Sequence, residues 1–156
     1  MTPTIKFRRL DGYDATIALP SYQTAGAAGA DVRANFVADL RDGGLTLAPL
    51  ARAVIPTGLG IEIPDGFEVQ VRMRSGLALK HGLTLPNAPG TIDSDYRGHL
   101  GVIVMNAGDQ PVTIAHGDRI AQLIVAPVVQ AEFVEVEDLS ETARGAGGYG
   151  STGVSQ

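Results

Sequence analysis

Glycine and proline divide this chain into short segments, and this feature limits the possible fold more than any other. The 156 residues contain twenty glycines and nine prolines, which leave little room for long helices. The segments between them have the patterns of β-strands. In FEVQVRMR, residues 67–74, apolar and polar side chains alternate as they do in a half-buried strand. The sequence therefore predicts an all-β domain.

Three further segments predict strands. LGIEIP, residues 59–64, repeats the alternation more weakly, whereas GVIVM (residues 101–105) and IAQLIVAPVV (residues 120–129) are apolar on both faces. Strands of this second type lie buried between two layers. Many short strands with closely spaced turn signals predict a sandwich, a jelly roll or a partly closed barrel. GLALKHG, residues 76–82, is the one segment that we predict as a short helix.

The composition of the chain changes after Glu137. Residues 138–156 contain one large apolar side chain, Leu139, and one aromatic ring, Tyr149, among glycines and polar residues. A chain of this length suits one hydrophobic core. We therefore predict a β domain over residues 1–137 and a flexible arm over residues 138–156.

Charge and composition exclude several classes of function. The chain has no cysteine, which excludes disulfides, thiolate nucleophiles and cysteine-ligated metal sites. Its net charge of −5 argues against binding along a nucleic-acid polymer, which needs clustered lysine and arginine. No apolar run has the length of a membrane span, and the N-terminus lacks a signal-peptide segment, so we expect no membrane contact and a cytoplasmic location. A small phosphorylated ligand stays possible because it needs only a few local cations, a metal, or both.

The tripeptide RSG, residues 74–76, has the features of an anion site at the end of a strand. A helix start presents unpaired N–H groups, Gly76 lets the backbone approach closely, Ser75 supplies a hydroxyl, and Arg74 offers a fork that matches phosphate oxygens. The alternative is that Ser75 only caps the helix while Arg74 is a solvated surface charge.

NAPGTIDSDYRG, residues 87–98, is predicted to form a β-hairpin that carries two carboxylates. In extended backbone Asp93 and Asp95 point the same way, so that one can act as a base near working pH or both can hold a cation. The alternative is an ordinary turn in which Asp95 pairs with Arg97 and nothing reacts.

Two polar residues elsewhere have either a structural or a ligand-binding role. Asp31, in AGADVRA, is flanked by small residues that leave room for a ligand, although an aspartate at the end of a loop is common. Gln122 interrupts an apolar strand, where its amide needs partners. A structural hydrogen bond and a ligand contact explain it equally well. The three histidines show no metal-ligand spacing, and we interpret them as surface or packing residues.

The stretch RGAGGYGSTG, residues 144–153, is a candidate lid. Its five glycines make ordering costly, so we expect it to stay mobile until a ligand offsets that entropy. Arg144 suits a terminal phosphate, Tyr149 suits stacking on a flat base, and Ser151 and Thr152 can add hydroxyl donors. An inert linker is the alternative.

Five motifs in this order, AGADV, RSGLA, GTIDSDYRG, GDRIAQLI and RGAGGYGSTG, resemble those of the dUTPase family and span nearly the whole chain. The resemblance implies a jelly-roll-like β-barrel, a homotrimer with active sites at subunit interfaces, and Mg²⁺-dependent hydrolysis of dUTP to dUMP and pyrophosphate. That reaction removes dUTP and supplies dUMP for thymidylate synthesis. Two departures are small: Tyr149 stands where phenylalanine is usual, and Val32 where leucine is common.

The resemblance also implies a role for each candidate residue. Asp93 corresponds to the carboxylate that activates or aligns the water attacking the α-phosphorus, and Tyr96 to the ring that leaves no room for a 2′-hydroxyl. Asn87 and the backbone of Thr91, Ile92 and Asp93 correspond to the uracil-reading site. The residues implied on the phosphate side are Arg74, Ser75 and Gly76 in the phosphate-binding loop, Asp31 and Gln122 near the water shell of a Mg²⁺ ion held mainly by substrate phosphates, and Arg144, Tyr149, Ser151 and Thr152 in the closing arm.

Two other functions fit the sequence less well. A dCTP deaminase of the same fold is implied to need a proton-shuttling glutamate just beyond the hairpin, and residues 98–108 contain none. A noncatalytic nucleotide-sensing or structural trimer is disfavoured because the chain keeps both Asp93 and the full arm.

Overall fold

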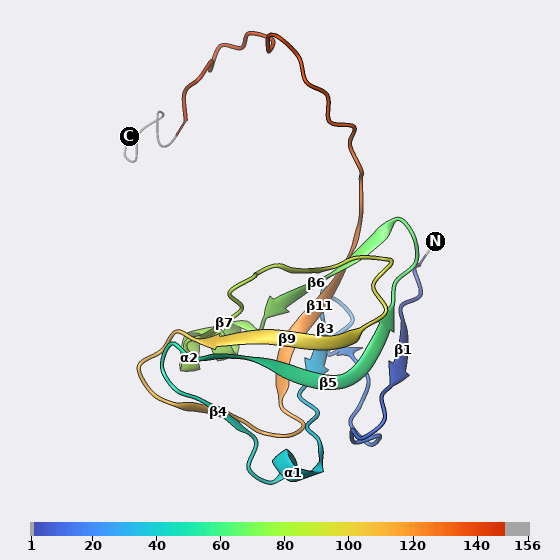
Figure 1. The fold of residues 1–156 in the computed structure, drawn as a ribbon, viewed down its shortest axis with the longest axis vertical. Helices are drawn as coiled ribbons and strands as arrows, with labels where there is room; N and C mark the ends of the chain where they lie inside the picture. The colour runs from blue at the N-terminus through green and yellow to red at the C-terminus, as the bar shows by residue number, and fades with distance from the viewer. Residues whose placement is uncertain (1, 149–156) are drawn as a thin grey trace.

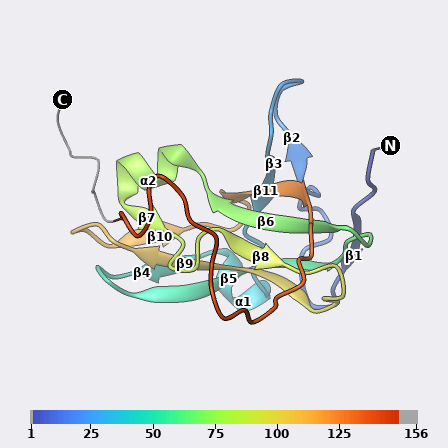
Figure 2. The same ribbon diagram turned by 90° about the horizontal axis from the view of Figure 1, so that it is seen from above.

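The alternating segments form two stacked β-sheets in the computed structural model, which describes residues 2–148 (Figure 1). One sheet has the strand order β1-β5-β9-β7, with β1 at Lys6–Arg9, β5 at Arg52–Glu62, β9 at His99–Asn106 and β7 at Leu83–Thr84. The other has the order β2-β3-β11-β6-β8, with β2 at Ser21–Tyr22, β3 at Ala30–Arg33, β11 at Arg119–Pro127, β6 at Phe67–Met73 and β8 at Gly90–Ile92. A two-stranded sheet joins β4 (Leu45–Leu47) to β10 (Val112–Ile114). In the second view the layer of β6 and β11 lies over that of β5 and β9 (Figure 2).

The core lies between the two larger sheets and is built from alternate residues of their strands. On β9, Leu100, Val102 and Val104 point inward and are each 1% exposed. Val69 and Val71 of β6 face them from the other layer and are 0% and 4% exposed. Burying each side chain of this kind contributes about 1.5–3 kcal/mol, so the alternation read from the sequence is also what holds the layers together.

The prediction of an all-β, jelly-roll-like fold is confirmed, although the two sheets do not close into a complete barrel. Each predicted strand is present, but β5 begins at Arg52 rather than Leu59, and β11 ends at Pro127 rather than Val129. Helix α2, at Ser75–His81, matches the predicted helix closely. Helix α1, at Ala38–Arg41, was not predicted, because it is a single turn whose N-cap residue, Val37, makes no side-chain capping hydrogen bond. Neither helix of residues 2–148 has the length and apolar character needed to cross a membrane.

The predicted hairpin over residues 87–98 is wrong in its pairing. Strand β8 pairs with β6, whereas β9 pairs with β5 and β7, so the two strands on either side of the turn belong to different sheets. The physical reason is that β9 is apolar on both faces and takes an inner position in its sheet, while the short β8 completes the edge of the other. The turn therefore carries the chain from one layer to the other.

The chain leaves the sheets after Pro127. Strand β11 ends at Pro127, and residues 128–148 contain no helix or strand. The backbone N–H of Val128 donates to the carbonyl oxygen of Gly66 (2.9 Å), after which the chain curves away from the sandwich (Figure 1). The division into a domain and an arm at Glu137 stays a prediction.

A polar network fastens the loop after β1 to the sandwich. Oδ1 of Asp14 accepts hydrogen bonds from the backbone N–H and the hydroxyl of Thr16 (2.8 and 2.7 Å), and Oδ2 lies 3.2 Å from Nε2 of His116. The N–H of Phe36 donates to Nδ1 of His116 (3.0 Å), so Nε2 of the neutral ring carries the proton and donates it to Asp14. These bonds, with those from Thr16 the strongest, lower the pKa of Asp14 from 3.8 to about 2.

We expect this network to weaken the fold in acid. Because the pKa of Asp14 is lower in the folded chain, its stabilising effect is complete above the unfolded value of 3.8 and is lost as the pH falls toward about 2. The free energy of unfolding of Asp14→Asn, measured by urea denaturation, should therefore fall less steeply over that interval than that of the unsubstituted protein. Asp11→Asn, which changes an exposed carboxylate of the same loop, is the control. Parallel curves for Asp14→Asn and the unsubstituted protein would contradict this expectation.

Candidate active site

The candidate residues fall into two groups at opposite ends of strand β6. Its C-terminal end leads directly into Arg74, Ser75 and Gly76. Strand β8 runs antiparallel to β6 with Ile92 opposite Val69, so the next residue, Asp93, lies at the N-terminal end of β6 beside Glu68. From Glu68 to Arg74 the strand rises about 3.3 Å per residue, which separates the two groups by about 20 Å.

At the Arg74 end, the carboxylate of Asp31 is held between two arginines. Its Oδ1 lies 3.3 Å from Nε of Arg74, and its Oδ2 lies 3.1 Å from Nη1 of Arg119. Arg74 also donates through Nη1 to the carbonyl oxygen of Arg119 (3.3 Å). The side chain of Asp31 is only 11% exposed, so water screens these contacts weakly. Asp31 thus fixes the direction of the Arg74 guanidinium, which is not the freely solvated charge of the alternative interpretation.

The strand register places Gln122 next to Asp31. Asp31 is opposite Gln122 on β11, and Gln122 is opposite Arg72 on β6, so the three side chains share the outer face of their sheet. Nε2 of Gln122 donates to the carbonyl oxygen of Met73 (3.3 Å). A Cβ at Gly29 would lie 2.5 Å from Oε1 of Gln122, so the amide in this position occupies space that a side chain at residue 29 would fill. Gln122 therefore has a structural partner within the chain and still faces the same side as Asp31.

Three arginines line one cavity of about 420 Å³ beside α2. They are Arg33, Arg74 and Arg119, and Nη1 of Arg33 donates to the carbonyl oxygen of Gly117 (2.7 Å). Guanidinium groups gathered in this way favour a ligand with several negative charges. Sequence reasoning missed Arg33 and Arg119, although Arg119 stands within GDRIAQLI, three residues before the Gln122 that it did select.

Ser75 and Gly76 are the first two residues of α2, and both are exposed. The N-cap position belongs to Arg74, without a side-chain capping hydrogen bond, so Ser75 does not cap the helix. The first backbone N–H groups of a helix have no partner within it. The backbone amides of Ser75 and Gly76, which directly follow Arg74 in the chain, are therefore additional donors at this end of β6.

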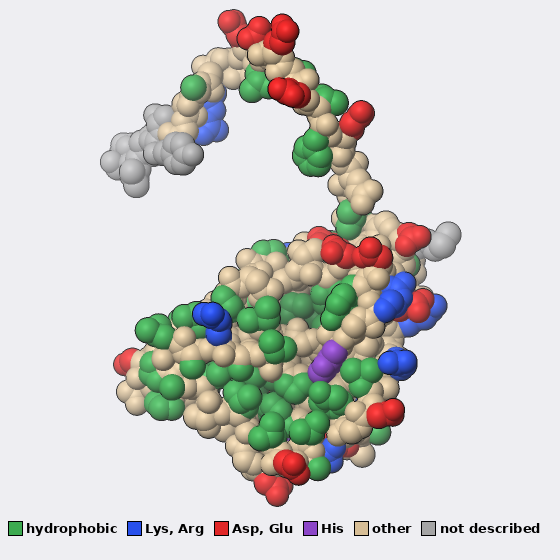
Figure 3. All heavy atoms as spheres, in the orientation of Figure 1, with side chains coloured by type: hydrophobic (Ala, Val, Ile, Leu, Met, Phe, Trp, Pro, Cys, Tyr) green, Lys and Arg blue, Asp and Glu red, His purple; other side chains and the backbone are tan. Residues whose placement is uncertain are grey.

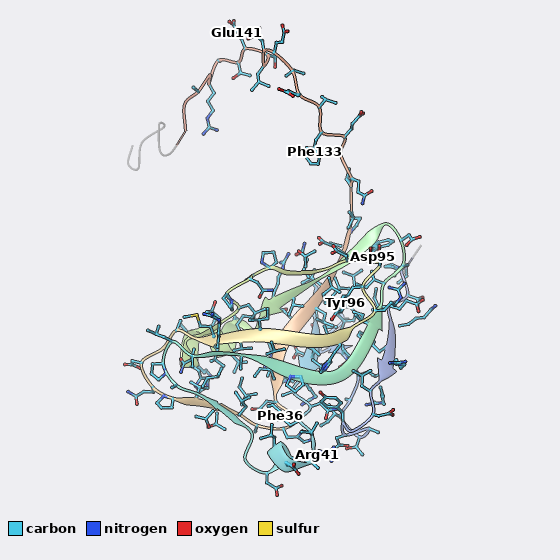
Figure 4. The ribbon with its side chains drawn as sticks, in the orientation of Figure 1. Phe36, Arg41, Asp95, Tyr96, Phe133 and Glu141 are labelled. Atoms are coloured by element: carbon cyan, nitrogen blue, oxygen red, sulfur yellow. The ribbon has the colours of Figure 1, made fainter. Side chains whose placement is uncertain are left out.

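At the other end of β6, Asp93 begins the turn between β8 and β9. The N–H of Tyr96 donates to the carbonyl oxygen of Asp93 (3.2 Å). Nη1 of Arg97 donates to the carbonyl oxygens of Ser94 (2.6 Å) and Tyr96 (2.8 Å), so Arg97 closes the turn and is not among the described ion-pair partners of Asp95. Asp95 and Tyr96 lie at the end of the sandwich from which the arm departs (Figure 4).

Asp93 borders two cavities at once. The smaller, of about 190 Å³, lies between β8 and β9 and is also lined by Thr91, Ile92, Tyr96, His99, Leu100 and Gly101. The larger, of about 590 Å³, also contains the carboxylates of Asp65, Glu68 and Asp95. The side chain of Asp93 is exposed, so it can reach a ligand or a water molecule in either cavity.

The smaller cavity is bordered by strand edges that lack a neighbouring strand among the residues described. Strand β8 is the last strand of its sheet, and β7 pairs only with Met105 and Asn106 of β9. Backbone N–H and C=O groups along these edges are available to a flat polar ligand. The side-chain amide of Asn87 lies beside Gly90 of β8, because its Nδ2 is 3.1 Å from where a Cβ of Gly90 would be.

The sequence analysis did not select His99, Leu100 and Gly101, because these lining residues lie on β9, beyond the end of the GTIDSDYRG motif at Gly98. The His99 ring packs against Tyr13 with 5.3 Å between ring centroids, and its buried Nε2 has no hydrogen-bond partner among residues 2–148. Burial lowers the pKa of this imidazole below 6.5. His99 is therefore neutral at pH 7 and adds no positive charge near Asp93.

The arm residues are not brought to either group. Nε of Arg144 donates to the carbonyl oxygen of Gly147 (2.7 Å), within a local turn of the arm. Tyr149, Ser151 and Thr152 lie outside the described residues. The roles of these four residues stay predictions.

The fold and the site define a class of protein: a jelly-roll-like β domain that offers one cavity for a polyanion and one pocket for a flat polar group beside a carboxylate. The dUTPase family model matches residues 15–153, and the chain belongs to this family. The deoxyuridine 5′-triphosphate nucleotidohydrolase of Dinoroseobacter shibae is 60% identical over 153 residues, which cover 98% of this chain and 99% of that protein. The protein of the same name from Roseobacter denitrificans is 61% identical over 150 residues, or 96% of each chain.

A solved structure supports the same assignment. The dUTPase of Staphylococcus bacteriophage 80alpha, determined with dUPNHPP, superposes with a TM-score of 0.83 at 26% identity and covers 98% of this chain and 100% of its own. The resemblance drawn from the five motifs is thereby confirmed at the level of the family.

We expect Arg119 to contribute to anion binding in the arginine cavity. Arg119→Gln removes one positive charge from this cavity and leaves Asp31 with a single arginine partner, and both effects disfavour an anion. A hydrogen bond to a charged group contributes about 1.5–3 kcal/mol, so binding of inorganic tripolyphosphate, measured by titration calorimetry, should weaken about tenfold or more. Arg52→Gln changes an exposed arginine on β5 and should leave the affinity near that of the unsubstituted protein. Equal affinities for the two variants would remove Arg119 from the anion site.

Proposed function

We propose that this chain hydrolyses dUTP to dUMP and pyrophosphate, with water attacking the α-phosphorus, and so removes dUTP and supplies dUMP for thymidylate synthesis. Its membership of the dUTPase family and the names of its relatives support the substrate. The observation that carries the chemistry is the position of Asp93, which borders both the pocket between β8 and β9 and the larger cavity beside it. A carboxylate at this boundary can accept a proton from a water molecule that lies next to a nucleotide in the pocket.

The pocket between β8 and β9 is the proposed site for uracil and deoxyribose. The backbone edges of Thr91, Ile92 and Gly101 and the amide of Asn87 supply donors and acceptors for the polar rim of the base. The cavity of about 190 Å³ is narrow, and forcing an additional methyl group into a filled site costs about 1–3 kcal/mol, which disfavours thymine. The ring of Tyr96 lines the same pocket and leaves no room for a 2′-hydroxyl.

The arginine cavity is the proposed site for the triphosphate. Displacement at phosphorus needs an in-line nucleophile and neutralisation of the charge on the phosphate oxygens, with little covalent help from the protein. Arg74, held by Asp31, supplies a directed positive charge, and Arg33 and Arg119 add to it. Ser75 and Gly76 can donate their backbone N–H groups to the same oxygens.

The residues present fit a Mg²⁺ ion that the substrate carries into the site. Residues 2–148 contain no group of three or more His, Asp or Glu side chains arranged to hold a metal ion. Mg²⁺ prefers phosphate and water oxygens with few protein ligands, so a dense carboxylate cluster is not required. Asp31 and Gln122, on one face beside the arginine cavity, are the residues that would contact its water shell. When bound, the ion would neutralise charge on the phosphate oxygens.

We infer that the complete active site forms between copies of the chain in a homotrimer. Asp93 and Arg74 of one chain lie about 20 Å apart along β6. A general base must be within hydrogen-bond reach of the attacking water, about 3 Å, and that water must in turn contact the α-phosphorus. Within one chain, a nucleotide whose phosphates are bound tightly by Arg74 is too far from Asp93 for this contact. A neighbouring copy can supply the Asp93 that this site lacks.

The outer face of the β5–β9 sheet supports such an assembly. On β9, the outward positions between the buried ones are Gly101, Ile103 and Met105. The neighbouring Val54 of β5 is 60% exposed, and hydrophobic side chains gather over β5 and β9 (Figure 3). A contiguous apolar face of this kind marks an association surface. Phe133 and Leu139 of the arm are 95% and 87% exposed and would likewise be buried against a neighbouring copy.

In this proposal the arm closes over the bound nucleotide. The chain from Pro127 to Arg144 can extend about 55 Å at about 3.3 Å per residue, far enough to cross a subunit boundary. Arg144 would exchange its exposed bond to Gly147 for one to the phosphates. We propose that Tyr149 stacks on the base while Ser151 and Thr152 donate hydroxyl hydrogen bonds.

A pyrophosphate-release assay with dUTP, dTTP, dCTP and UTP tests this proposal. Among the four nucleotides, we expect fast release only from dUTP, and we expect this release to require Mg²⁺. Asp93→Asn should still bind dUTP but turn it over about 10²- to 10⁴-fold more slowly, because an amide cannot accept the proton of the attacking water. Asp109→Asn, an exposed substitution in another loop, is the matched control. Near-normal turnover by Asp93→Asn would overturn the assignment of the base, and equal rates for all four nucleotides would overturn the substrate.

A further inference from the structure

Gly98 closes the motif GTIDSDYRG, and neither the fold nor the proposed chemistry assigns it a role. Its backbone does not need glycine, because its φ angle is not among the positive values that favour this residue. Gly82 is different: it has φ of +66°, and a Cβ there would lie 2.7 Å from the backbone of Gly108. Gly98 must therefore be explained by what lies next to it.

The neighbour of Gly98 is the ring of Tyr96. A Cβ built on Gly98 would lie 2.6 Å from Cζ and 2.9 Å from Cε2 of that ring, and closer still to its hydroxyl oxygen. Carbon atoms in contact are ordinarily about 3.5–4.0 Å apart, so even the side chain of alanine cannot occupy this position while the ring stays where it is. The end of the Tyr96 ring therefore occupies the space that a side chain at position 98 would fill.

The same end of the ring is also held by a hydrogen bond, and the residue is fixed through its backbone. The hydroxyl of Tyr96 donates a hydrogen bond to the carbonyl oxygen of His99 (2.8 Å). The backbone of Tyr96 is fixed by its N–H bond to Asp93 and by the donation from Arg97 to its carbonyl oxygen. A ring that is 43% exposed is thus fixed in one position without a packed core around it.

We propose that Gly98 and the carbonyl of His99 form a seat for the Tyr96 ring, and that Gly98 is a positioning residue that sets the preference for deoxyribose over ribose. The inference rests on the proposed function, in which Tyr96 excludes the 2′-hydroxyl. The Tyr96 ring can discriminate between ribose and deoxyribose only if it cannot move, because a displaced ring leaves room for the 2′-hydroxyl. The seat supplies that rigidity on a turn that is otherwise open to solvent.

The experiment compares the ratio of kcat/KM for dUTP to kcat/KM for UTP among variants of the full-length protein. In Gly98→Ala the methyl group displaces the ring, so we expect this ratio to fall at least tenfold. Tyr96→Phe removes only the bond to the His99 carbonyl and should lower the ratio by a smaller factor. Gly43→Ala is the matched control, because a Cβ there meets nothing within 4 Å and the φ angle is not positive.

A double-substitution cycle separates a positioning role from a general structural one. If Gly98 acts only through the ring, Tyr96→Ala and the Tyr96→Ala, Gly98→Ala double variant should have the same dUTP-to-UTP ratio. An additional loss in the double variant, or an unchanged ratio in Gly98→Ala, would overturn the seat. If Gly98→Ala does not fold, Tyr96→Phe is compared with the unsubstituted protein instead. An unchanged dUTP-to-UTP ratio in Tyr96→Phe would then overturn the seat.

The same set of variants separates failure of this inference from failure of the proposed function. A ratio that falls in Tyr96→Ala but not in Gly98→Ala keeps the proposed role of Tyr96 and removes that of Gly98. A ratio that stays constant in Tyr96→Ala removes both. A readout without catalysis is the NMR spectrum of the chain labelled at its four tyrosines, in which Gly98→Ala should shift the Tyr96 ring resonances and Gly43→Ala should not.

Discussion

The site depends on the rigidity of β6. This strand is paired along its length with β11 on one side, and with β8 on the other over Val69–Val71. On its outer face, Nη2 of Arg72 donates to Gln70 and Nε2 of Gln70 donates to Glu68, both at 2.6 Å, so a row of side-chain bonds runs along the strand as well. A strand held in this way cannot bend to bring its ends together. The separation of Arg74 from Asp93 is therefore a fixed property of the fold.

The second constraint is that the chain changes layers between β8 and β9. An ordinary hairpin would have paired these strands and used their backbone groups, leaving no pocket. Because each strand pairs in a different sheet, neither of the edges that face each other across the pocket has a neighbouring strand there among residues 2–148, and the turn between them presents Asp93 and Tyr96. The pocket is thus a consequence of the strand topology. The backbone edges of β8 and β9 form it, and the side chains of Asp93 and Tyr96 add to its lining.

Much of the fold could be predicted from the sequence because alternation in strands such as β6 follows directly from burial of one face. The five ordered motifs identified the family and selected Asp31, Arg74, Asp93 and Gln122, each of which the structure places at one of the two groups or beside it. Strand pairing could not be predicted in the same way, because alternation shows which face of a strand is buried but not which strand lies beside it. The predicted hairpin failed for this reason.

The residues that sequence reasoning missed share a cause. Arg33 and Arg119 become neighbours of Arg74 only through pairing between distant strands, and Gly101 contributes backbone rather than a side chain. Gly98 acts by having no side chain, and its importance depends on where a ring two residues earlier lies. Each of these properties exists only in three dimensions.

In the homotrimer that we propose, the two ends of β6 that form one active site come from different copies of the chain. Mixing two inactive variants, Asp93→Asn and Arg74→Ala, tests this arrangement when they are unfolded together and refolded in equal amounts. If each site takes Asp93 from one copy and Arg74 from another, random assembly should restore about a quarter of the turnover of the unsubstituted protein. If both residues of a site come from the same chain, no mixed assembly contains an intact site, and a turnover no higher than that of the separate variants would contradict the shared site.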